Sequence, residues 1–144
     1  MPKILIGIDT GVHTGFAVAF DHGEGGVLQK VQSLSITQAM QCVLEYEDEH
    51  NLKDIMLYIE DARKRTWFTG GREKAQGVGS VKRDAQIWED WCKEQGINFK
   101  LIHPAANATK KKVEDFTRTT GWAGRTNEHA RDAAMLVFKR YWKA

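Results

Sequence analysis

Two acidic side chains stand directly after apolar segments of strand length. Asp9 follows an Ile-rich run at residues 4–8, and Glu60 follows a similar run at residues 55–59. Neither run alternates between apolar and polar residues, which is typical of strands buried on both faces of a sheet. Burying an Asp at a strand end is costly unless hydrogen bonds or a cation stabilise it, so Asp9 could also serve only as a turn cap. A second acid at a neighbouring strand end favours a shared cation.

A third set of candidate ligands lies near the C-terminus. His129 and Asp132 are three residues apart in a segment with helical periodicity, so their side chains project from one face of the helix. The small residues Ala133 and Ala134 beside them would let this helix lie close against a sheet. A His and an Asp at this spacing fit a metal-binding pair, although an unliganded His at a helix start is the commoner arrangement.

The second half of the chain is basic, which is compatible with a polyanionic partner. Residues 63–144 hold 18 Lys and Arg against 9 Asp and Glu, whereas residues 1–62 hold 3 against 10, and the net charge is +2. The segment at residues 62–80 combines cations with glycines and two adjacent aromatic side chains. Its cations could bind phosphates and its aromatics could stack on unpaired bases, unless the aromatics pack on the core. The candidates for contact with nucleic acid in this segment are Arg63, Lys64, Arg65, Trp67, Phe68, Arg72 and Lys74.

A second basic group, formed by Lys110, Lys111 and Lys112, is expected near the start of a short helix. The helix dipole disfavours cations at that position, so these lysines indicate a phosphate partner or else form a solvated face.

Hydrophobic periodicity predicts an α/β arrangement around the candidate residues. Three strands joined by short glycine-containing turns suggest an antiparallel meander, and two more strands alternate with helices. The strands are expected at residues 3–8, 16–20, 27–34, 55–59 and 97–102. The first two helices are expected at residues 38–50 and about 80–95. A third, short helix is expected to start at residue 107 or 109, with Val113 and Phe116 pointing inward. The last helix is expected from residue 126 or 127 to about 142, with Tyr141 on its buried side.

Composition narrows the class of protein. A chain of 144 residues fits one domain, residues 1–144, and its hydrophobic content of 42% and charged content of 28% are ordinary for a globular protein. We expect no membrane span, because no apolar run approaches about 18 residues. Cys42 and Cys92 lie in helical patterns without Cys-x-x-Cys spacing, so we expect reduced core thiols in a cytoplasmic protein of bacterial or phage origin.

The order of elements, with acids at the ends of the first and fourth strands and on the last helix, is similar to a ribonuclease H-like layout. The motifs that carry the resemblance are Gly7-Ile8-Asp9-Thr10-Gly11 with Thr14-Gly15-Phe16, Ile59-Glu60, Gly77-Val78-Gly79, and His129-Ala130-Arg131-Asp132-Ala133-Ala134. Together they resemble the successive motifs of RuvC-type Holliday junction resolvases. The resemblance extends from residue 4 to about residue 137.

The resemblance implies a fold, an activity and a set of site residues. The fold would be α/β and ribonuclease H-like, with a central mixed five-stranded sheet flanked by helices. The protein would be a homodimeric endonuclease that uses two Mg²⁺ ions, or Mn²⁺, to hydrolyse phosphodiesters in four-way or branched DNA. Asp9, Glu60 and Asp132 match the family's catalytic and metal-binding acids, and His129 stands where many bacterial members have a fourth Asp. Trp67 or Phe68 would insert at the centre of the junction.

Three other classes of protein remain open. The hairpin from Gly11 to Gly15 also resembles the phosphate-binding hairpin of actin-like ATPases, but that fold needs two such domains and this chain is too short. Another ribonuclease H-like nuclease, acting on RNA–DNA hybrids or flaps, would use the same metal chemistry. A nucleic-acid-binding module without strong catalysis is the third alternative.

Overall fold

The computed structural model describes residues 2–61, 63, 72–107 and 111–143, with the backbone only for residues 72–81 and 105. Strands and helices alternate after an initial run of three strands. The strands are β1 (Lys3–Asp9), β2 (Thr14–Asp21), β3 (Val27–Leu34), β4 (Ile55–Glu60) and β5 (Asn98–Ile102). The helices are α1 (Ile36–Glu49), α2 (Arg72–Gln95), α3 (Val113–Thr120) and α4 (Glu128–Val137), with 3₁₀ turns at Leu52–Asp54 and Pro104–Ala106.

The five strands form one mixed sheet in the order β3-β2-β1-β4-β5. The first three strands are antiparallel neighbours, which confirms the predicted meander, whereas β1, β4 and β5 run parallel. Ile8 pairs with Ile59 in the register of β1 and β4. The acids that follow these two residues, Asp9 and Glu60, therefore end adjacent parallel strands at the same edge of the sheet. We call this edge, where β1 and β4 end, the acidic edge.

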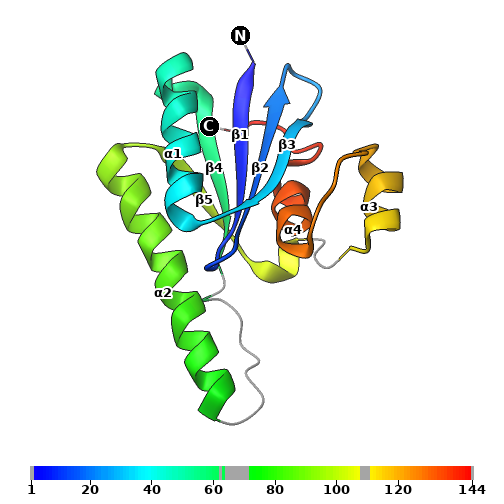
Figure 1. Cartoon of the computed structure of the whole chain (residues 1–144). Helices are drawn as coiled ribbons and strands as arrows, with labels where there is room; N and C mark the ends of the chain where they lie inside the picture. Colours follow the sequence, from blue (N-terminus) through cyan, green and yellow to red (C-terminus); the bar gives the residue numbers. More distant parts are fainter. Residues whose placement is uncertain (1, 62, 64–71, 108–110, 144) are drawn as a thin grey trace.

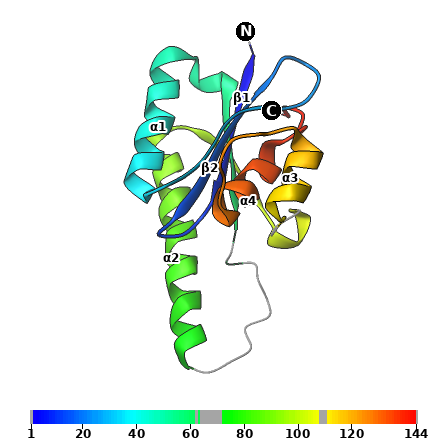
Figure 2. The same cartoon turned by 45° about the vertical axis from the view of Figure 1, so that its right-hand side comes forward.

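The sheet separates two apolar layers because successive side chains of a strand point to opposite faces. On one face, Ile4, Ile6 and Ile8 of β1 pack with Trp88 of α2 and Val43 of α1. The other face, which we call the α4 face, carries small and aromatic side chains that pack with α4. Figures 1 and 2 show α1 and α2 on one side of the sheet and α4, with α3 beyond it, on the other. β1 and β4 are buried on both faces, as their continuous apolar runs predict.

Capping groups fix the starts of two helices. The Ser35 hydroxyl accepts a hydrogen bond from the Gln38 backbone N–H, and the Ser35 backbone N–H donates to Oε1 of Gln38. These two bonds form a capping box at the start of α1. The Asn127 side chain accepts from the Ala130 N–H at the start of α4, at 2.9 Å. Ser35 and Asn127 are thus the N-caps of α1 and α4.

α2 begins at Arg72, so the predicted loop over residues 62–80 is wrong for its second half. The residues from Arg72 to Gln76 are strong helix formers, and they outweigh the helix-breaking tendency of the two glycines that follow. In Figure 1 the first turns of α2 project past the sheet beyond the acidic edge. Within the part of the chain that is described, no helix is both long and apolar enough to cross a membrane.

The last two helices are shorter than predicted. α3 starts only at Val113, after Lys112 in an extended conformation, and Val113 is exposed rather than inward-facing; Phe116 is buried as expected. α4 ends at Val137, because the backbone of Lys139 and Arg140 hydrogen-bonds to Gly26 instead of continuing the helix. Tyr141 lies beyond this end and is 57% exposed, so its predicted burial is wrong.

Asp21 joins the C-terminal segment to the turn between β2 and β3. Its carboxylate accepts from the backbone N–H groups of Gly23 at 2.7 Å, Gly25 at 3.0 Å and Trp142 at 2.8 Å. These bonds, that from Trp142 first, hold the pKa of Asp21 below its usual range. One nearly buried carboxylate therefore closes a turn and holds residues 138–143 against the sheet.

Asp21→Asn is expected to lower the free energy of unfolding by about 1–3 kcal/mol at neutral pH, because an amide cannot accept at both oxygen positions. Since the folded-state pKa is lowered, this contribution is complete above the unfolded-state value near 3.8 and is lost as the pH falls through the lower folded value. Urea denaturation of parent and variant should give a constant difference from about pH 5 to 8 that narrows below about pH 4. The exposed Asp48→Asn serves as control; a difference already absent at about pH 6 would contradict the role of Asp21.

Candidate active site

Three carboxylates meet at the acidic edge, on the α4 face of the sheet. Asp9 from β1, Glu60 from β4 and Asp132 from α4 are 9%, 2% and 7% exposed. Both Glu60 and Asp132 repel the Asp9 carboxylate electrostatically, so each of these two acids lies within interaction range of Asp9. The structure thus brings together the acids that were singled out in separate parts of the sequence.

His129 is bound directly to Asp9. Its Nδ1 lies 3.1 Å from Oδ2 of Asp9, and its side chain is 49% exposed. The ring also stacks near His13 of the β1–β2 turn, with centroids 6.5 Å apart. The one-turn spacing of His129 and Asp132 along α4 places both beside Asp9, as the sequence predicts.

Asn107 connects two of the acids from a different part of the chain. Its side-chain amide donates to the backbone carbonyl of Asp132 at 3.0 Å and to Oε2 of Glu60 at 3.4 Å. The sequence suggested only that a helix starts at residue 107 or 109. In the structure it lies after β5 and orients the Glu60 carboxylate toward α4.

Two glycines set the distance between α4 and the sheet. A Cβ built on Gly15 would lie 1.9 Å from the carbonyl oxygen of His129, and one on Gly7 would lie 2.2 Å from that of Ala133. Such distances are far below contact, so only glycine fits at these two strand positions. The expected close approach of the helix is confirmed, and it requires small residues on the sheet as well as on α4.

Without a bound cation, burial and mutual repulsion disfavour the ionised form of all three carboxylates at once. The pKa of Asp9 is raised from 3.8 to about 7, first by burial and then by repulsion from Glu60; repulsion from Asp132 adds to this, and the hydrogen bond from His129 acts in the opposite direction. A buried carboxyl group with a strongly raised pKa at a surface edge is characteristic of functional sites.

The donor set is suited to a hard divalent cation, since carboxylate oxygens are the ligands that Mg²⁺ prefers. Among the described residues, no group of three or more His, Cys, Asp or Glu side chains is arranged as a metal site. One hydrogen bond joins His129 to Asp9, and the amide of Asn107 joins the Glu60 carboxylate to the backbone of Asp132. Binding a cation would therefore require the carboxylates of Asp9, Glu60 and Asp132, which are already neighbours, to move closer together.

Arg63 is occupied within the protein. Its guanidinium binds Asp61 at 2.7 Å, Glu89 at 2.7 Å and the side chain of Gln86 at 2.6 Å, which ties the end of β4 to α2. These contacts give Arg63 a structural role, while its contact with DNA stays a prediction. The pKa of its guanidinium is raised by these partners, the hydrogen bond to Asp61 first.

The other predicted nucleic-acid contacts are only partly covered by the structure. Lys64, Arg65, Trp67, Phe68 and Lys110 lie outside the described residues. Arg72 and Lys74 are in the first turn of α2, where only the backbone is described. Lys111 and Lys112 precede α3 rather than lying within it, which corrects their expected placement on a helix. The carbonyl of Lys111 accepts from Arg131 of α4 at 2.8 Å, so this basic segment is tied to the helix that carries Asp132.

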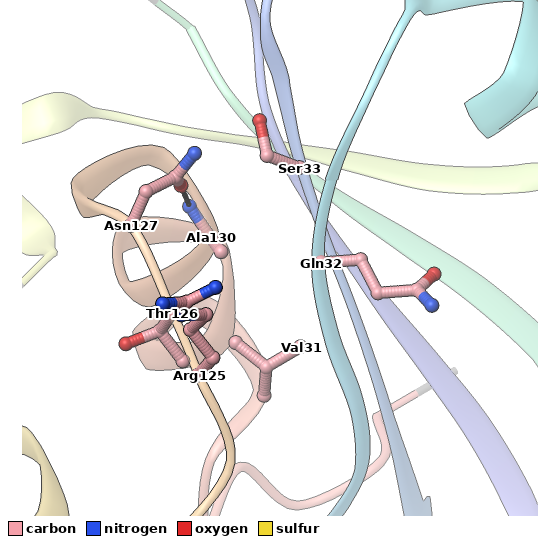
Figure 3. A pocket seen from close by; sticks show the side chains of 7 residues that line it. All are labelled: Val31, Gln32, Ser33, Arg125, Thr126, Asn127 and Ala130. Carbon is pink, nitrogen blue, oxygen red and sulfur yellow. Dashed lines mark hydrogen bonds between the residues drawn. The ribbon is translucent and has the colours of Figure 1, made fainter.

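A pocket of about 350 Å³ opens beside the start of α4, lined by Val31, Gln32, Ser33, Arg125, Thr126, Asn127 and Ala130. In Figure 3, Val31 lies on the side of β3 toward α4, while Gln32 points away from the helix. The pocket borders the helical turn that carries His129. Its surface is mainly apolar, and among the described residues of its lining Arg125 is the one cation.

Sequence reasoning missed the roles of Asn107 and His13, and that of Gly15 as a contact for α4. All three depend on contacts between distant segments, and none lies in a spacing that sequence periodicity can detect. No family model matches the chain, and no curated protein sequence matches it significantly.

Proposed function

We propose that the protein is a metal-dependent endonuclease that cuts branched DNA, with a ribonuclease H-like fold and the chemistry of RuvC-type resolvases. The observation that carries the proposal is the meeting of Asp9, Glu60 and Asp132 at one edge of the sheet. The strand order β3-β2-β1-β4-β5, with only β2 antiparallel to the other four strands, supports the fold assignment. The electrostatic repulsion at Asp9 supports the binding of a cation there.

Asp9, Glu60 and Asp132 would hold Mg²⁺ or Mn²⁺, with His129 beside them. When bound, two such ions would supply Lewis-acid activation of a water molecule and stabilisation of the leaving oxygen of a phosphodiester. His129 would orient the Asp9 carboxylate through its Nδ1, and its half-exposed ring would be accessible to a substrate. Asn107 fixes the rotamer of Glu60.

Cations near the acidic edge would bind the DNA backbone. Arg72 and Lys74 lie in the first turns of α2, which project beyond the acidic edge (Figure 1). Lys111 and Lys112 precede α3, and the carbonyl of Lys111 accepts from Arg131 of α4. Arg125 adds a positive charge beside the pocket at the start of α4. Homodimer formation would place two such sites on one four-way junction, which paired nicking requires.

Asn107→Ala is expected to weaken metal-dependent cleavage by about 10- to 100-fold, because residues that orient metal ligands carry effects of this size. The Mg²⁺ concentration for half-maximal cleavage should rise, since Glu60 loses the donor that fixes its orientation. A merely structural role would lower the melting temperature without changing that concentration. Asn51→Ala is the matched control, because the Asn51 side chain makes no capping hydrogen bond.

The proposed function is tested by incubating the full chain with a labelled four-way junction, a flap, an RNA–DNA hybrid and plain duplex. Each substrate is tested with Mg²⁺, with Mn²⁺ and with a chelator. Symmetrically paired nicks on the junction, absent with the chelator, are the expected result. Cleavage of the hybrid or flap alone would assign another ribonuclease H-like nuclease. Binding without cleavage under every metal condition would contradict the enzyme assignment.

A further inference from the structure

Arg63 lies between the end of β4 and the side of α2. It follows closely on Asp61, the residue directly after Glu60 of the candidate active site. Its Nε and Nη2 donate to the two carboxylate oxygens of Asp61 at 2.7 and 3.2 Å, which is a bidentate arrangement. The backbone N–H of Arg63 donates to the same carboxylate at 3.1 Å. Asp61 therefore fixes both the backbone and the side chain of Arg63 at the end of the strand.

The same guanidinium also reaches α2. Its Nη2 lies 2.7 Å from Oε1 of Glu89, and its Nη1 donates to Oε1 of Gln86 at 2.6 Å. The Gln86 amide in turn donates to Asp90 at 2.9 Å. Lys93 Nζ lies 3.0 Å from the second carboxylate oxygen of Glu89, so both acceptors are held from their other side as well. One guanidinium thus joins the end of β4 to adjacent turns of α2.

This bridge is largely shielded from water. The side chains of Asp61, Arg63 and Glu89 are 3%, 22% and 17% exposed. Ion pairs on an open surface contribute little, whereas a partly buried pair is screened much less by salt. The hydrogen bond from Arg63 is the first cause that holds the pKa of Glu89 below its usual range, so this carboxylate is charged at neutral pH. The bridge is therefore suited to hold two elements at a fixed angle.

The bridge lies beside the packed half of α2. Ala85, Trp88 and Cys92 on this half are fully buried. The helix begins at Arg72, which is about 21 Å before Gln86 at 1.5 Å per residue. Figures 1 and 2 show these first turns projecting past the sheet beyond the acidic edge. A tilt of about 10° at the bridge would therefore move the start of α2 by about 4 Å.

We propose that Arg63 is a positioning residue that sets the angle between α2 and the sheet, and so places the basic first turns of α2 correctly for DNA at the acidic edge. This inference rests on the proposed function, in which Arg72 and Lys74 of these turns contact the DNA backbone. Arg63 acts through α2 and does not itself need to touch the DNA. Such placement matters because a displacement of about 1 Å can cost about 100-fold in rate.

The first experiment measures the angle of α2 without DNA or metal. Residual dipolar couplings of the backbone amides of the full chain report the orientation of α2 relative to the strands. Arg63→Ala and Glu89→Ala should each change the couplings of α2, while the couplings of the strands keep their parental pattern. Couplings of α2 that match those of the parent in both variants would overturn the proposal.

The second experiment measures the binding of a labelled four-way junction by fluorescence anisotropy over a series of salt concentrations. Arg63→Ala and Glu89→Ala should both weaken binding about tenfold and lower the slope of log K against log salt by about 1–2, because cations of the first turns lose their phosphates. The sign of the Glu89→Ala effect is decisive, since removing an acid that does not position α2 would strengthen the binding of a polyanion. The double variant should bind no more weakly than either single variant, because both changes break the same bridge.

Arg63→Lys separates bridging from charge. Lys keeps the positive charge but lacks the planar fork, so it cannot hold the three partners together and should weaken DNA binding as Arg63→Ala does. Arg118→Ala is the matched control, because Arg118 forms an ion pair with Asp115 at 3.0 Å within α3 and joins it to no other element through that pair. This control should keep the parental couplings of α2 and the parental affinity for the junction.

The opposite pattern of binding would assign a different role to Arg63. Parental binding by Arg63→Lys, together with parental or tighter binding by Glu89→Ala, would show that Arg63 contacts DNA directly and would overturn its role as a positioning residue. If the parent binds no DNA, the proposed function fails, whereas the dipolar couplings still test whether Arg63 sets the angle of α2. The two failures are therefore distinguishable.

Discussion

Asp9→Asn is expected to reduce metal-dependent cleavage of branched DNA by at least about 10³-fold, because it removes a charged ligand from the centre of the site. Asp9 is the acid that Glu60, Asp132 and His129 all act on, so no neighbouring carboxylate can take its place. Binding of DNA should be retained, since the basic segments are unchanged. Cleavage and anisotropy measurements on the same substrate separate the two effects.

The same variant has a second expected result that does not depend on catalysis. The pKa of Asp9 is raised to about 7 in the metal-free protein, so its carboxylate destabilises the fold increasingly as the pH rises from about 3.8 to about 7. Asn mimics the protonated acid and removes this cost. Metal-free Asp9→Asn should therefore be more stable than the parent at pH 8 by a few kcal/mol, taking about 1.4 kcal/mol per pKa unit. The difference should shrink toward pH 4.

Asp115→Asn is the control for both readouts, because Asp115 lies on the surface of α3, where it is paired with Arg118. Adding Mg²⁺ should raise the melting temperature of the parent but not that of Asp9→Asn, since a ligand of the folded state stabilises it by mass action. Junction cleavage by Asp9→Asn at the rate of the parent would show that Asp9 is not in the active site.

Gly15→Ala is expected to cause the largest loss of stability among single-methyl additions to β2. Its Cβ would lie 1.9 Å from the carbonyl oxygen of His129 and 2.9 Å from the Cβ of Asp9, and the first of these neighbours is backbone. Either α4 or the β1–β2 hairpin must move, at a cost of about 3 kcal/mol. For a domain of this size that is roughly 10 °C in Tm.

Cleavage should fall together with stability, because the shift separates His129 from Asp9. Gly96→Ala is the matched control: Gly96 has a φ of +70° but no atom within 4 Å of the added Cβ. The free energy of unfolding of that variant should fall by only about 1 kcal/mol, from backbone strain, and the variant should keep its activity. A Gly15→Ala protein with parental Tm and parental cleavage would contradict the close approach of α4.

The acids of the site could be predicted from local pattern, since each follows or lies within an element with clear periodicity. Asp9 and Glu60 end continuous apolar runs, and Asp132 lies one turn after a capped helix start. The parallel pairing of β1 and β4, which brings the first two acids together, follows from the long connection between these strands. The positions of the candidate acids could therefore be predicted from the sequence alone.

Helix ends were less predictable because tertiary contacts override local propensity. α4 stops at Val137, where the chain pairs with Gly26, although the apolar pattern continues to Tyr141. α2 starts earlier than its glycines indicate, because the preceding residues favour a helix. Arg63 was grouped with the DNA contacts by composition alone, and the structure pairs it with Asp61 and Glu89.

The sequence by itself determined the buried strands, the order of elements and the residues Asp9, Glu60, His129 and Asp132, because periodicity and residue type are local properties. Only the tertiary structure decided how they meet. The hydrogen bond from His129 to Asp9 joins residues 120 positions apart, and the docking of α4 depends on a missing side chain at Gly15. Contacts between distant segments carry no periodic signal in one sequence, so packing alone sets the geometry of the candidate site.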